Sequence, residues 1–443
     1  MLRKLYSRTE HLSLMSASNT AFYLVLSSTT PVHCVCHTPQ LPTAMNRTLD
    51  NSKGKVITCK AAVCWAPGEA LVMEEVQVAP PQALEVRIRI ICTSLCHTDV
   101  SFWSNKQNNT GYPRIFGHEA VGRVESAGEN VKDIEEGDLV IPVFMPHCTE
   151  CVDCKSTKSN MCTILGSKSA GLMTIDNSAR FSINGKPIYQ FLGVSSFTEY
   201  TVVEVECVVK IDPMAAPDKV CLLSCGVTTG LGGVWKVGNV EKGATVAVFG
   251  LGTVGMAVAE GARIRGASKI VGVDVNPTKF DIGKKFGVTE FVNPKDHEKP
   301  VHQVIKEMTG SGVDYSFDCT GNKSVIVEAF KSTRNGWGTT VVLGANMTEV
   351  PIDCAELLRG KTIKGSFFGG MKAKTDLPLL VDKYMKKELQ LDDFITHEIS
   401  FPEINKAFEL LKEGECLRCI MWMDWTAHCI SFLSPITENV WVW

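Results

Sequence analysis

The stretch that most constrains the fold of this chain lies near the middle of the sequence. It begins with an apolar strand pattern, Ala244–Phe249, and continues directly into Gly250-x-Gly252-x-x-Gly255. A helical pattern and a second strand follow, and that strand ends at Asp274. A lone glycine motif is a weak signal, but these glycines lie between a strand and a helix, with an acid about twenty residues further on. We therefore predict a parallel-sheet domain that holds a dinucleotide pyrophosphate at the start of the helix.

A second constraint is a group of cysteines in the first half of the chain. Their spacing is Cys148-x-x-Cys151-x-x-Cys154-x7-Cys162. Four thiolates so spaced can surround one tetrahedral zinc ion and leave no open position, which is typical of structural sites. Disulfides are the alternative, but cysteines this close on a tight loop close poorly into bonds. The group predicts a structural zinc ion and a reducing compartment.

A separate set of residues has the chemistry of a catalytic zinc site. Cys96, His118 and Cys225 are too far apart in sequence for a zinc finger, so a folded domain must bring them together. Three protein ligands leave a fourth position open for substrate. An isolated cysteine or histidine is more often simply buried. The two motifs above favour the metal-site interpretation here.

Composition excludes several classes of protein. A chain of 443 residues predicts two or three domains. Its net charge of −3 offers no field that would attract nucleic acid or anionic lipid, and 44% of its residues are apolar. No stretch reaches the eighteen or so uncharged apolar residues that a membrane span needs. We expect a globular enzyme in the cytoplasm.

The two ends differ from the rest. Residues 1–50 are rich in serine and threonine, and basic residues outnumber acidic ones. We expect a disordered leader; a transit peptide to an organelle within residues 1–45, or an upstream start before Met45, are the alternatives, and a secretory signal is the least favoured. Residues 425–443 form an extra apolar tail, which we expect to be poorly ordered or packed peripherally.

The remaining patterns indicate two kinds of domain. A β-rich first part is predicted, whose strand ends and loops carry the metal ligands. The apolar run from Val220 is expected to end in a glycine-punctuated turn at Gly230. Further strands of the parallel sheet are expected at Val313–Asp318 and Thr339–Gly344. The strands of the β-rich part are predicted at Val56–Ala61, Glu85–Ile90, Gly117–Val124 and Gly137–Phe144.

Together these motifs resemble the zinc-containing medium-chain alcohol dehydrogenases, and the plant branch in particular. The resemblance rests on Cys96-His97-Thr98-Asp99, Gly117-His118-Glu119, the four-cysteine group, Leu223-Ser224-Cys225-Gly226 and the glycine motif, and runs from about Gly54 to about Asp424. It implies a β-rich GroES-like catalytic domain with an inserted Rossmann-type, doubly wound domain. The implied boundaries are 51–226 and 368–424 for the catalytic domain, with a zinc lobe at 145–165, and 227–367 for the NAD-binding domain.

The resemblance also implies roles for individual residues. Cys96, His118 and Cys225 would bind the catalytic zinc, with Glu119 behind it, and Thr98 would take the alcohol proton. Relatives continue the proton path through a histidine or tyrosine three residues later, and Ser101 stands there. NAD would be held by His97, Thr229, Gly250, Gly252, Gly255, Asp274, Lys279 and Arg418. Phe144, Phe191 and Leu192 would line the substrate pocket.

Three hypotheses of function follow from the resemblance. The first is an NAD-dependent alcohol dehydrogenase with two zinc ions per subunit, acting as a homodimer on small alcohols or aldehydes. The second is the related S-(hydroxymethyl)glutathione dehydrogenase, which is disfavoured because Thr163-Ile164-Leu165-Gly166 stands where that relative places an arginine. The third is a catalytically silent dinucleotide-binding protein, against which the complete ligand set counts.

Overall fold

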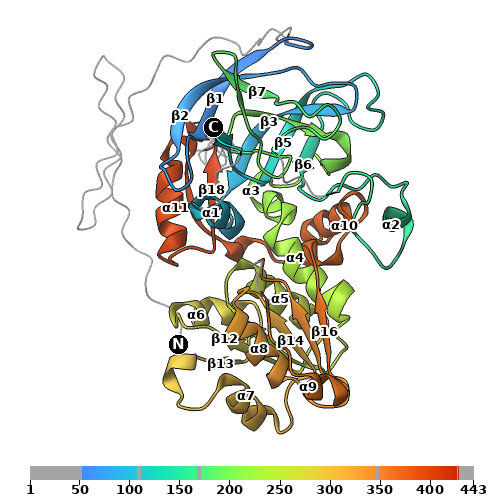
Figure 1. Ribbon diagram of the computed structural model, residues 1–443, viewed down its shortest axis with the longest axis vertical. Helices are drawn as coiled ribbons and strands as arrows, with labels where there is room; N and C mark the ends of the chain where they lie inside the picture. The colour runs from blue at the N-terminus through green and yellow to red at the C-terminus, as the bar shows by residue number, and fades with distance from the viewer. Residues whose placement is uncertain (1–51, 107–110, 167–170, 346–348, 427, 429–443) are drawn as a thin grey trace, which may run out of the picture. The chain divides into compact units, whose positions relative to one another are not determined.

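The computed structural model describes residues 52–106, 111–166, 171–345, 349–426 and 428. The predicted leader at 1–50 lies outside the described residues, as does most of the tail. Ser52–Trp443 belong to one compact unit of the chain. Three sheets carry the described part (Figure 1).

The first sheet confirms the parallel sheet that the glycine motif predicted. Its six strands are parallel and run in the order β13-β12-β11-β14-β15-β16. The central strand β11 is almost wholly buried, as expected for a strand covered by helices on both faces. The strands are β11 (Thr245–Phe249), β12 (Lys269–Val273), β13 (Glu290–Val292), β14 (Tyr315–Asp318), β15 (Thr339–Val342) and β16 (Thr362–Gly365). The helices between them are α5 (Thr253–Ile264), α6 (Thr278–Lys285), α7 (Val301–Thr309), α8 (Lys323–Ser332) and α9 (Cys354–Leu358).

The second sheet is built from segments on both sides of the parallel sheet in sequence. Its strands run β10-β6-β5-β3-β18-β17, with β9 also paired to β3. The late strand β18 pairs antiparallel with β3, so the chain returns to its first domain after the parallel sheet. The strands are β3 (Glu85–Ser94), β5 (Glu119–Ala127), β6 (Leu139–Pro142), β9 (Tyr200–Glu204), β10 (Val208–Lys210), β17 (Ile395–Ser400) and β18 (Arg418–Trp422). The exact boundaries 226/227 and 367/368 stay a prediction.

The third sheet completes the β-rich domain. It runs in the order β4-β1-β2-β7-β8. Its strands are β1 (Ile57–Cys64), β2 (Val72–Val78), β4 (Arg114–Ile115), β7 (Phe181–Ile183) and β8 (Lys186–Ile188). The α-helices outside the parallel sheet are α1 (His97–Ser104), α2 (Val152–Lys155), α3 (Pro217–Val220), α4 (Gly226–Gly232), α10 (Ala373–Met385) and α11 (Ile404–Lys412). Short 3₁₀ turns are η1 (Val205–Cys207), η2 (Cys221–Ser224), η4 (Pro294–Asp296), η5 (Phe368–Gly370), η6 (Asp392–Phe394) and η7 (Phe401–Glu403), and a π-helix, η3 (Gly233–Gly238), extends α4.

The expected turn ending at Gly230 is wrong, because the segment is the helix α4. Its glycines serve close packing and not a turn. A Cβ on Gly230 would lie 2.5 Å from the Cβ of Ala257 and 2.5 Å from the carbonyl oxygen of Val254, both in α5. The glycine content that suggested a chain reversal therefore allows two helices to touch along their backbones.

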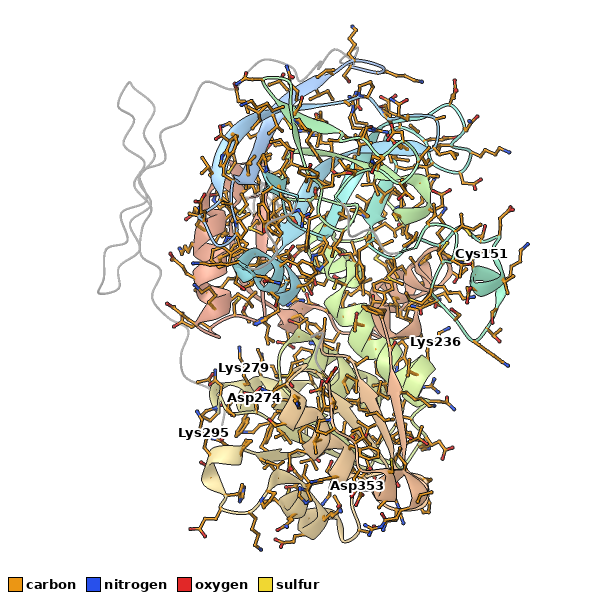
Figure 2. All side chains as sticks on the ribbon, in the orientation of Figure 1. Cys151, Lys236, Asp274, Lys279, Lys295 and Asp353 are labelled. Atoms are coloured by element: carbon orange, nitrogen blue, oxygen red, sulfur yellow. The ribbon has the colours of Figure 1, made fainter. Side chains whose placement is uncertain are left out.

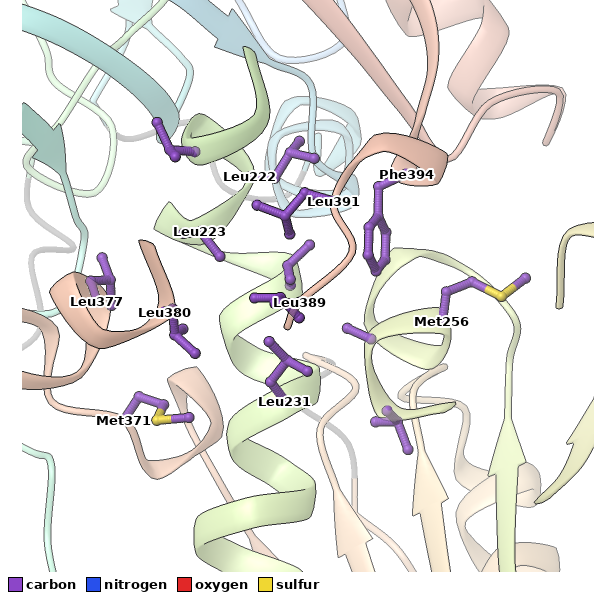
Figure 3. Close-up of a cluster of buried hydrophobic side chains, with 14 of the residues drawn as sticks. Leu222, Leu223, Leu231, Met256, Met371, Leu377, Leu380, Leu389, Leu391 and Phe394 are labelled. Carbon is purple, nitrogen blue, oxygen red and sulfur yellow. The ribbon is translucent and has the colours of Figure 1, made fainter. Parts of the chain in front are cut away.

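A hydrophobic cluster joins the two predicted domains (Figure 3). Leu231 of α4 and Met256 of α5 belong to it, together with Leu377 and Leu380 of α10 and Phe394. Each of these side chains is at most 2% exposed. Because one contiguous core spans α4, α5 and α10, both chain passages between the domains are packed into a common interior.

The described part of the C-terminal tail packs on the edge of the second sheet. The ring of His428 stacks on Trp422 with centroids 3.8 Å apart, and its Nε2 lies 3.1 Å from Oε2 of Glu398. Trp422 donates to the same carboxylate oxygen at 2.8 Å. The expectation for the whole tail stays a prediction, because residues 429–443 are outside the described part.

No single described helix has both the length and the apolarity needed to cross a membrane. One bent pair, Pro217–Ser224 with Gly226–Gly238 at 60°, meets that requirement by length and composition alone.

Candidate active site

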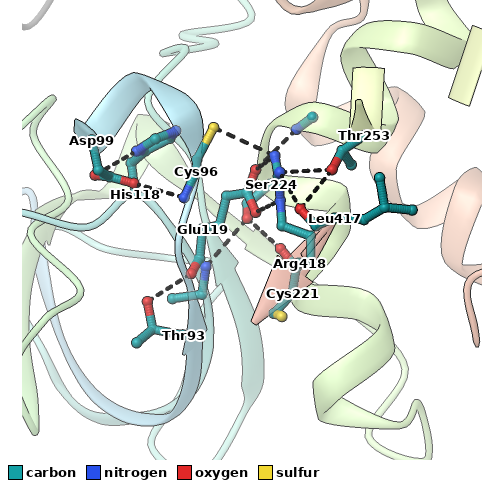
Figure 4. Close-up of polar contacts among 12 residues, drawn as sticks. Thr93, Cys96, Asp99, His118, Glu119, Cys221, Ser224, Thr253, Leu417 and Arg418 are labelled. Carbon is teal, nitrogen blue, oxygen red and sulfur yellow. Dashed lines mark hydrogen bonds and ion pairs between the residues drawn. The ribbon is translucent and has the colours of Figure 1, made fainter. Parts of the chain in front are cut away.

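Three separate segments bring the predicted catalytic zinc ligands together. Cys96 follows β3 and precedes α1, His118 precedes β5, and Cys225 lies between η2 and α4. Their ligand atoms, with one oxygen of Glu119, all lie within 4.8 Å of one another. All of these side chains are at most 9% exposed. The prediction that folding assembles these residues into one group agrees with this geometry. Figure 4 shows Cys96, His118 and Glu119 of this group.

The carboxylate of Asp99 organises this group. It accepts hydrogen bonds from the backbone N–H of Cys96 at 3.1 Å and of Gly117 at 3.0 Å, and from Nδ1 of His118 at 3.0 Å. Because Nδ1 donates to a carboxylate, the lone pair of Nε2 is left for a ligand. Sequence reasoning gave Asp99 no role. The signal was available, since an acid at the third residue of a helix commonly bonds back to the N-cap, which here is Cys96.

The imidazole Nε2 provides a test of whether the site suits a metal ion. This atom is buried and has no hydrogen-bond partner among the described residues. A hydrogen bond from Cys225 lowers the pKa of the Cys96 thiol well below its ordinary value, and the charge of Arg418 adds to this against the effect of burial. A buried imidazole nitrogen without a partner, beside a thiol that ionises easily, is the donor set that zinc prefers.

Behind these ligands lies a fully buried ion pair. Arg418 donates from Nε and Nη2 to the two carboxylate oxygens of Glu119, each at 2.8 Å. Its other N–H groups reach the hydroxyl of Thr253 at 2.7 Å, the carbonyl of Leu417 at 3.0 Å and the sulfur of Cys96 at 3.4 Å. Burial raises the pKa of Glu119, although the charge of Arg418 opposes this. Since every N–H of the guanidinium has an acceptor, the predicted contact of Arg418 with a pyrophosphate requires an exchange of partners and stays a prediction.

Two aromatic rings pack against the imidazole of His118. Phe144 and Phe191 both meet the ring of His118 edge-on, with centroids 5.8 Å away in each case. Phe368 packs against Phe144 at 5.4 Å. Leu192, also predicted to line the pocket, is half-buried and has a positive φ of 51°. The structure therefore brings Phe144 and Phe191 to the metal group, as expected for pocket residues.

The predicted proton path begins on α1. Thr98 is half-buried, and Ser101 is exposed one turn further along the helix. Residues three apart lie on the same helix face, so both hydroxyls lie on one side of α1. His97, predicted to face the pyrophosphate, is the exposed first residue of the same helix.

The four-cysteine group forms a closed cluster of its own. Cys148, Cys151, Cys154 and Cys162 have their sulfur atoms within 4.8 Å of one another, and none of the described cysteines forms a disulfide. The backbone N–H of Cys151 donates to the sulfur of Cys148, and that of Cys154 to the sulfur of Cys151, both at 3.3 Å. The bond from Cys154 lowers the pKa of Cys151 to about 5. Backbone donors aimed at sulfur favour thiolates, and four of them fit one tetrahedral ion.

The glycine motif has the backbone that a bound pyrophosphate requires. Gly250 has a φ of +90°, and a Cβ on Gly255 would lie 1.9 Å from the carbonyl oxygen of Gly250. Both glycines are therefore needed by the turn itself. A Cβ on Gly252, at the N-cap of α5, would meet nothing within 4 Å. The space that Gly252 leaves open lies at the start of a helix and suits an anionic group.

The predicted ribose contacts lie at the ends of neighbouring elements (Figure 2). Asp274 follows β12, and its carboxylate accepts the N–H of Leu251 at 2.7 Å and that of Asn276 at 2.8 Å. Lys279 of α6 is half-buried, and burial lowers its pKa while the charge of Asp274 opposes this. Thr229, predicted to contact the nicotinamide, lies in α4 and is 8% exposed.

These features are typical of one class of protein: an oxidoreductase that combines a metal site of three protein ligands with a dinucleotide-binding sheet. Comparisons with known proteins identify the family. Residues 82–213 match the family described as alcohol dehydrogenase GroES-like domain, and residues 253–384 match zinc-binding dehydrogenase. Alcohol dehydrogenase-like 7 of Arabidopsis thaliana is 56% identical over 385 residues, covering 85% of this chain and 99% of that protein. Alcohol dehydrogenase 1 of Zea mays is 56% identical over 374 residues, covering 84% and 99%.

Solved structures give the same result. An alcohol dehydrogenase zinc-binding domain protein from Burkholderia ambifaria has a TM-score of 0.77 at 30% identity, covering 84% of this chain and 100% of that one. Benzyl alcohol dehydrogenase from Acinetobacter calcoaceticus has the same TM-score at 26% identity, covering 83% and 100%. The chain belongs to the zinc-containing medium-chain alcohol dehydrogenases, in their plant branch, and is an enzyme of that family, for which zinc and NAD are the typical cofactors. The predicted family and fold class are confirmed.

The four-cysteine group and the group of Cys96, His118 and Cys225 predict different responses to substitution. Purified protein is expected to hold two zinc ions per chain by elemental analysis. Cys151→Ala is expected to lower the midpoint of thermal unfolding by about 10 °C, because metal binding at a closed site contributes to the stability of the fold. Cys225→Ala is expected to lose one zinc and essentially all turnover while keeping its unfolding midpoint within about 3 °C of the unaltered protein.

The exposed Cys354, which belongs to neither group, supplies the control. Cys354→Ala is expected to keep both metal ions and full stability. A Cys151→Ala protein as stable as this control would contradict the structural assignment.

Proposed function

We propose that this chain interconverts small or medium primary alcohols and aldehydes with NAD at the Cys96, His118 and Cys225 site. The observation that supports this most directly is the buried Nε2 of His118, which has no partner among the described residues and lies beside two thiols. Aromatic rings surround that imidazole, so a substrate there would be largely shielded from water. Secondary alcohols and ketones would use the same chemistry.

The residues divide into a metal-holding set and a cofactor-holding set. Cys96, His118 and Cys225 would hold a zinc ion, which supplies a Lewis acid that lowers the pKa of an alcohol hydroxyl. Bound NAD would supply the hydride acceptor. Thr98 would take the alcohol proton, Glu119 would hold Arg418 behind the ligands, and Phe144, Phe191 and Leu192 would shape the pocket. The cofactor would be held by His97, Thr229, Gly250, Gly252, Gly255, Asp274, Lys279 and Arg418.

Steady-state assays test the proposed reaction. With NAD, ethanol and longer primary alcohols are expected to be oxidised, and S-(hydroxymethyl)glutathione is expected to be a poor substrate. The reason is that Thr163–Gly166 offer no cation to the carboxylates of glutathione. Preferred oxidation of the glutathione adduct would favour the alternative dehydrogenase. Absence of turnover with every alcohol, in protein that binds zinc and NADH, would favour a silent binding protein.

Asp274 predicts a preference for NAD over NADP. Two backbone hydrogen bonds hold its carboxylate at the end of β12, so the charge cannot turn away from a 2′-phosphate. Asp274→Asn removes the charge and replaces one of the two acceptor oxygens with an amide group, and is expected to shift the ratio of kcat/KM values toward NADP by about ten- to a hundred-fold. Asp281→Asn, an exposed acid of α6, is the control and is expected to leave the ratio unchanged. Equal use of both cofactors by the unaltered enzyme would contradict the role of Asp274.

The serine at position 101 predicts that proton transfer to solvent limits the rate of alcohol oxidation near pH 7. A serine hydroxyl has no pKa near neutrality, so Ser101 can pass a proton only through water. Alcohol oxidation is expected to be slower near pH 7 than at alkaline pH, with partial rescue by imidazole buffer. Ser101→His is expected to raise the rate near pH 7 by about ten-fold and to weaken the buffer effect.

A histidine elsewhere on the same helix provides the matched control for this prediction. Ser104 is also exposed on α1, and Ser104→His is expected to change neither rate nor buffer response. If Ser101→His behaved like Ser104→His, proton transfer at this position would not limit the reaction, and product release would be the next step to examine.

We also propose that the chain forms a homodimer through the open edge of the parallel sheet. The strand β16 is an edge strand with mostly exposed residues, and Leu358 just before it is 89% exposed. Unpaired edges next to exposed apolar side chains favour pairing with another chain. Sedimentation equilibrium is expected to give twice the chain mass, and Leu358→Asp is expected to weaken the association.

The cytoplasmic location and the domain boundaries 51–226, 227–367 and 368–424 remain predictions.

A further inference from the structure

The four-cysteine lobe is fastened to the segment through which the chain leaves the parallel sheet. That segment joins β16 to α10 and includes η5. The side-chain amide of Asn160, in the lobe, donates to the carbonyl of Phe367 at 3.0 Å and to that of Met371 at 3.1 Å. In the opposite direction, Nζ of Lys372 donates to the carbonyl of Cys154 at 2.6 Å and to that of Ser156. Two side chains therefore join the lobe and the connecting segment from both sides.

The same segment packs against α4, where the chain first crosses from the β-rich domain to the parallel-sheet domain. A Cβ on Gly232 of α4 would lie 2.4 Å from the carbonyl oxygen of Gly369, and a Cβ on Gly369 would lie 2.5 Å from that of Thr229. Backbones this close leave no room for one segment to shift without the other. Thr229 is the residue predicted to contact the nicotinamide, so this packing leads from the connecting segment to the cofactor site.

The carboxylate of Asp376 links the lobe to both segments that connect the two domains. Asp376, in the first turn of α10, accepts the backbone N–H of Lys372 at 2.8 Å. Its other oxygen lies 3.2 Å from Nζ of Lys236, in the π-helix that extends α4. A continuous set of contacts therefore runs from Cys154 through Lys372 and Asp376 to Lys236.

We infer that Lys372 and Asn160 are positioning residues through which the four-cysteine lobe sets the affinity of the enzyme for its cofactor. Among the described residues, the hydrogen-bond acceptors of these two side chains are backbone carbonyls, and the two residues act by fixing the connecting segment against α4. Chains of packed and hydrogen-bonded residues can carry coupling of this kind, and the contacts above form such a chain from the lobe to Thr229. The inference rests on the proposed cofactor and on zinc binding by the lobe.

Binding of the dinucleotide to the intact enzyme tests the inference. The dissociation constant of NADH is measured by fluorescence titration of zinc-loaded Lys372→Met and Asn160→Ala. Both variants are expected to bind NADH about five-fold more weakly than the unaltered enzyme, a size typical of coupling between distant sites. Lys372→Arg, which keeps donors for the lobe carbonyls, is expected to restore most of the affinity. Lys386→Met removes an exposed lysine directly after α10, at the opposite end of that helix from Lys372, and is expected to change nothing.

Coupling between two sites is reciprocal, so NADH bound at the cofactor site must also affect the four-cysteine lobe, and a second measurement tests this. The rate at which iodoacetamide alkylates the peptide containing Cys148–Cys162 is followed by mass spectrometry in the presence of a chelator. NADH is expected to slow this alkylation in the unaltered enzyme and in Lys386→Met, but much less in Lys372→Met. This readout concerns the lobe alone and is independent of turnover.

The possible outcomes separate the inference from the proposed function. If the unaltered enzyme bound no NADH, the proposed function would fail, and the inference with it. If the unaltered enzyme bound NADH and both Lys372→Met and Asn160→Ala bound it equally well, the inference alone would be overturned. Equal protection of the lobe by NADH in Lys372→Met and Lys386→Met would also overturn it. If Lys372→Met failed to fold, Asn160→Ala, which leaves Lys372 in place, would decide between these results.

Discussion

The buried pair between Arg418 and Glu119 is the contact on which the site depends. Removing two charges from water costs several kcal/mol per ion, and this cost is offset only when the geometry is good and the remaining donors are satisfied. Here both carboxylate oxygens accept from the guanidinium, and each remaining N–H has its own acceptor. The pair joins β18 to β5 across 299 residues of sequence. The return of the chain to its first domain is therefore what completes the wall behind the metal ligands.

This arrangement also joins the predicted metal site to the predicted dinucleotide site. Thr253, the first residue of α5, accepts a hydrogen bond from Arg418 and donates one to the carbonyl of Leu417 at 2.9 Å. The same guanidinium reaches the sulfur of Cys96 at 3.4 Å. Arg418 thus contacts both Thr253, at the helix start that suits a pyrophosphate, and Cys96, a predicted zinc ligand. A change of charge at either place alters the electrostatic environment of the other, because both lie in a region that excludes water.

The sequence predicted those parts of the structure that local patterns encode. The strands and the glycine turn followed from periodicity and spacing, and the two cysteine groups were found because zinc restricts ligand type and number. Contacts between distant segments were not predictable in this way. Lys372 meets the carbonyl of Cys154 across 218 residues, and no local pattern marks either as a partner of the other. Asp99 stood inside a recognised motif, but its role depends on the position of His118. The helix α4 was misread because glycines that permit close packing look the same in sequence as glycines that form a turn.

The described residues after Asp424 pack against the edge of the second sheet. β17 is the edge strand of its sheet, and Glu398 on that strand accepts from Trp422 and pairs with His428. The edge of a sheet and a large aromatic ring, such as Trp422 at the end of β18, are both surfaces that proteins commonly cover. The first tail residues lie against this edge, on a strand that supplies none of the predicted zinc ligands. The contacts of His428 with Trp422 and Glu398 therefore lie on strands other than those that lead to Cys96, His118 and Cys225.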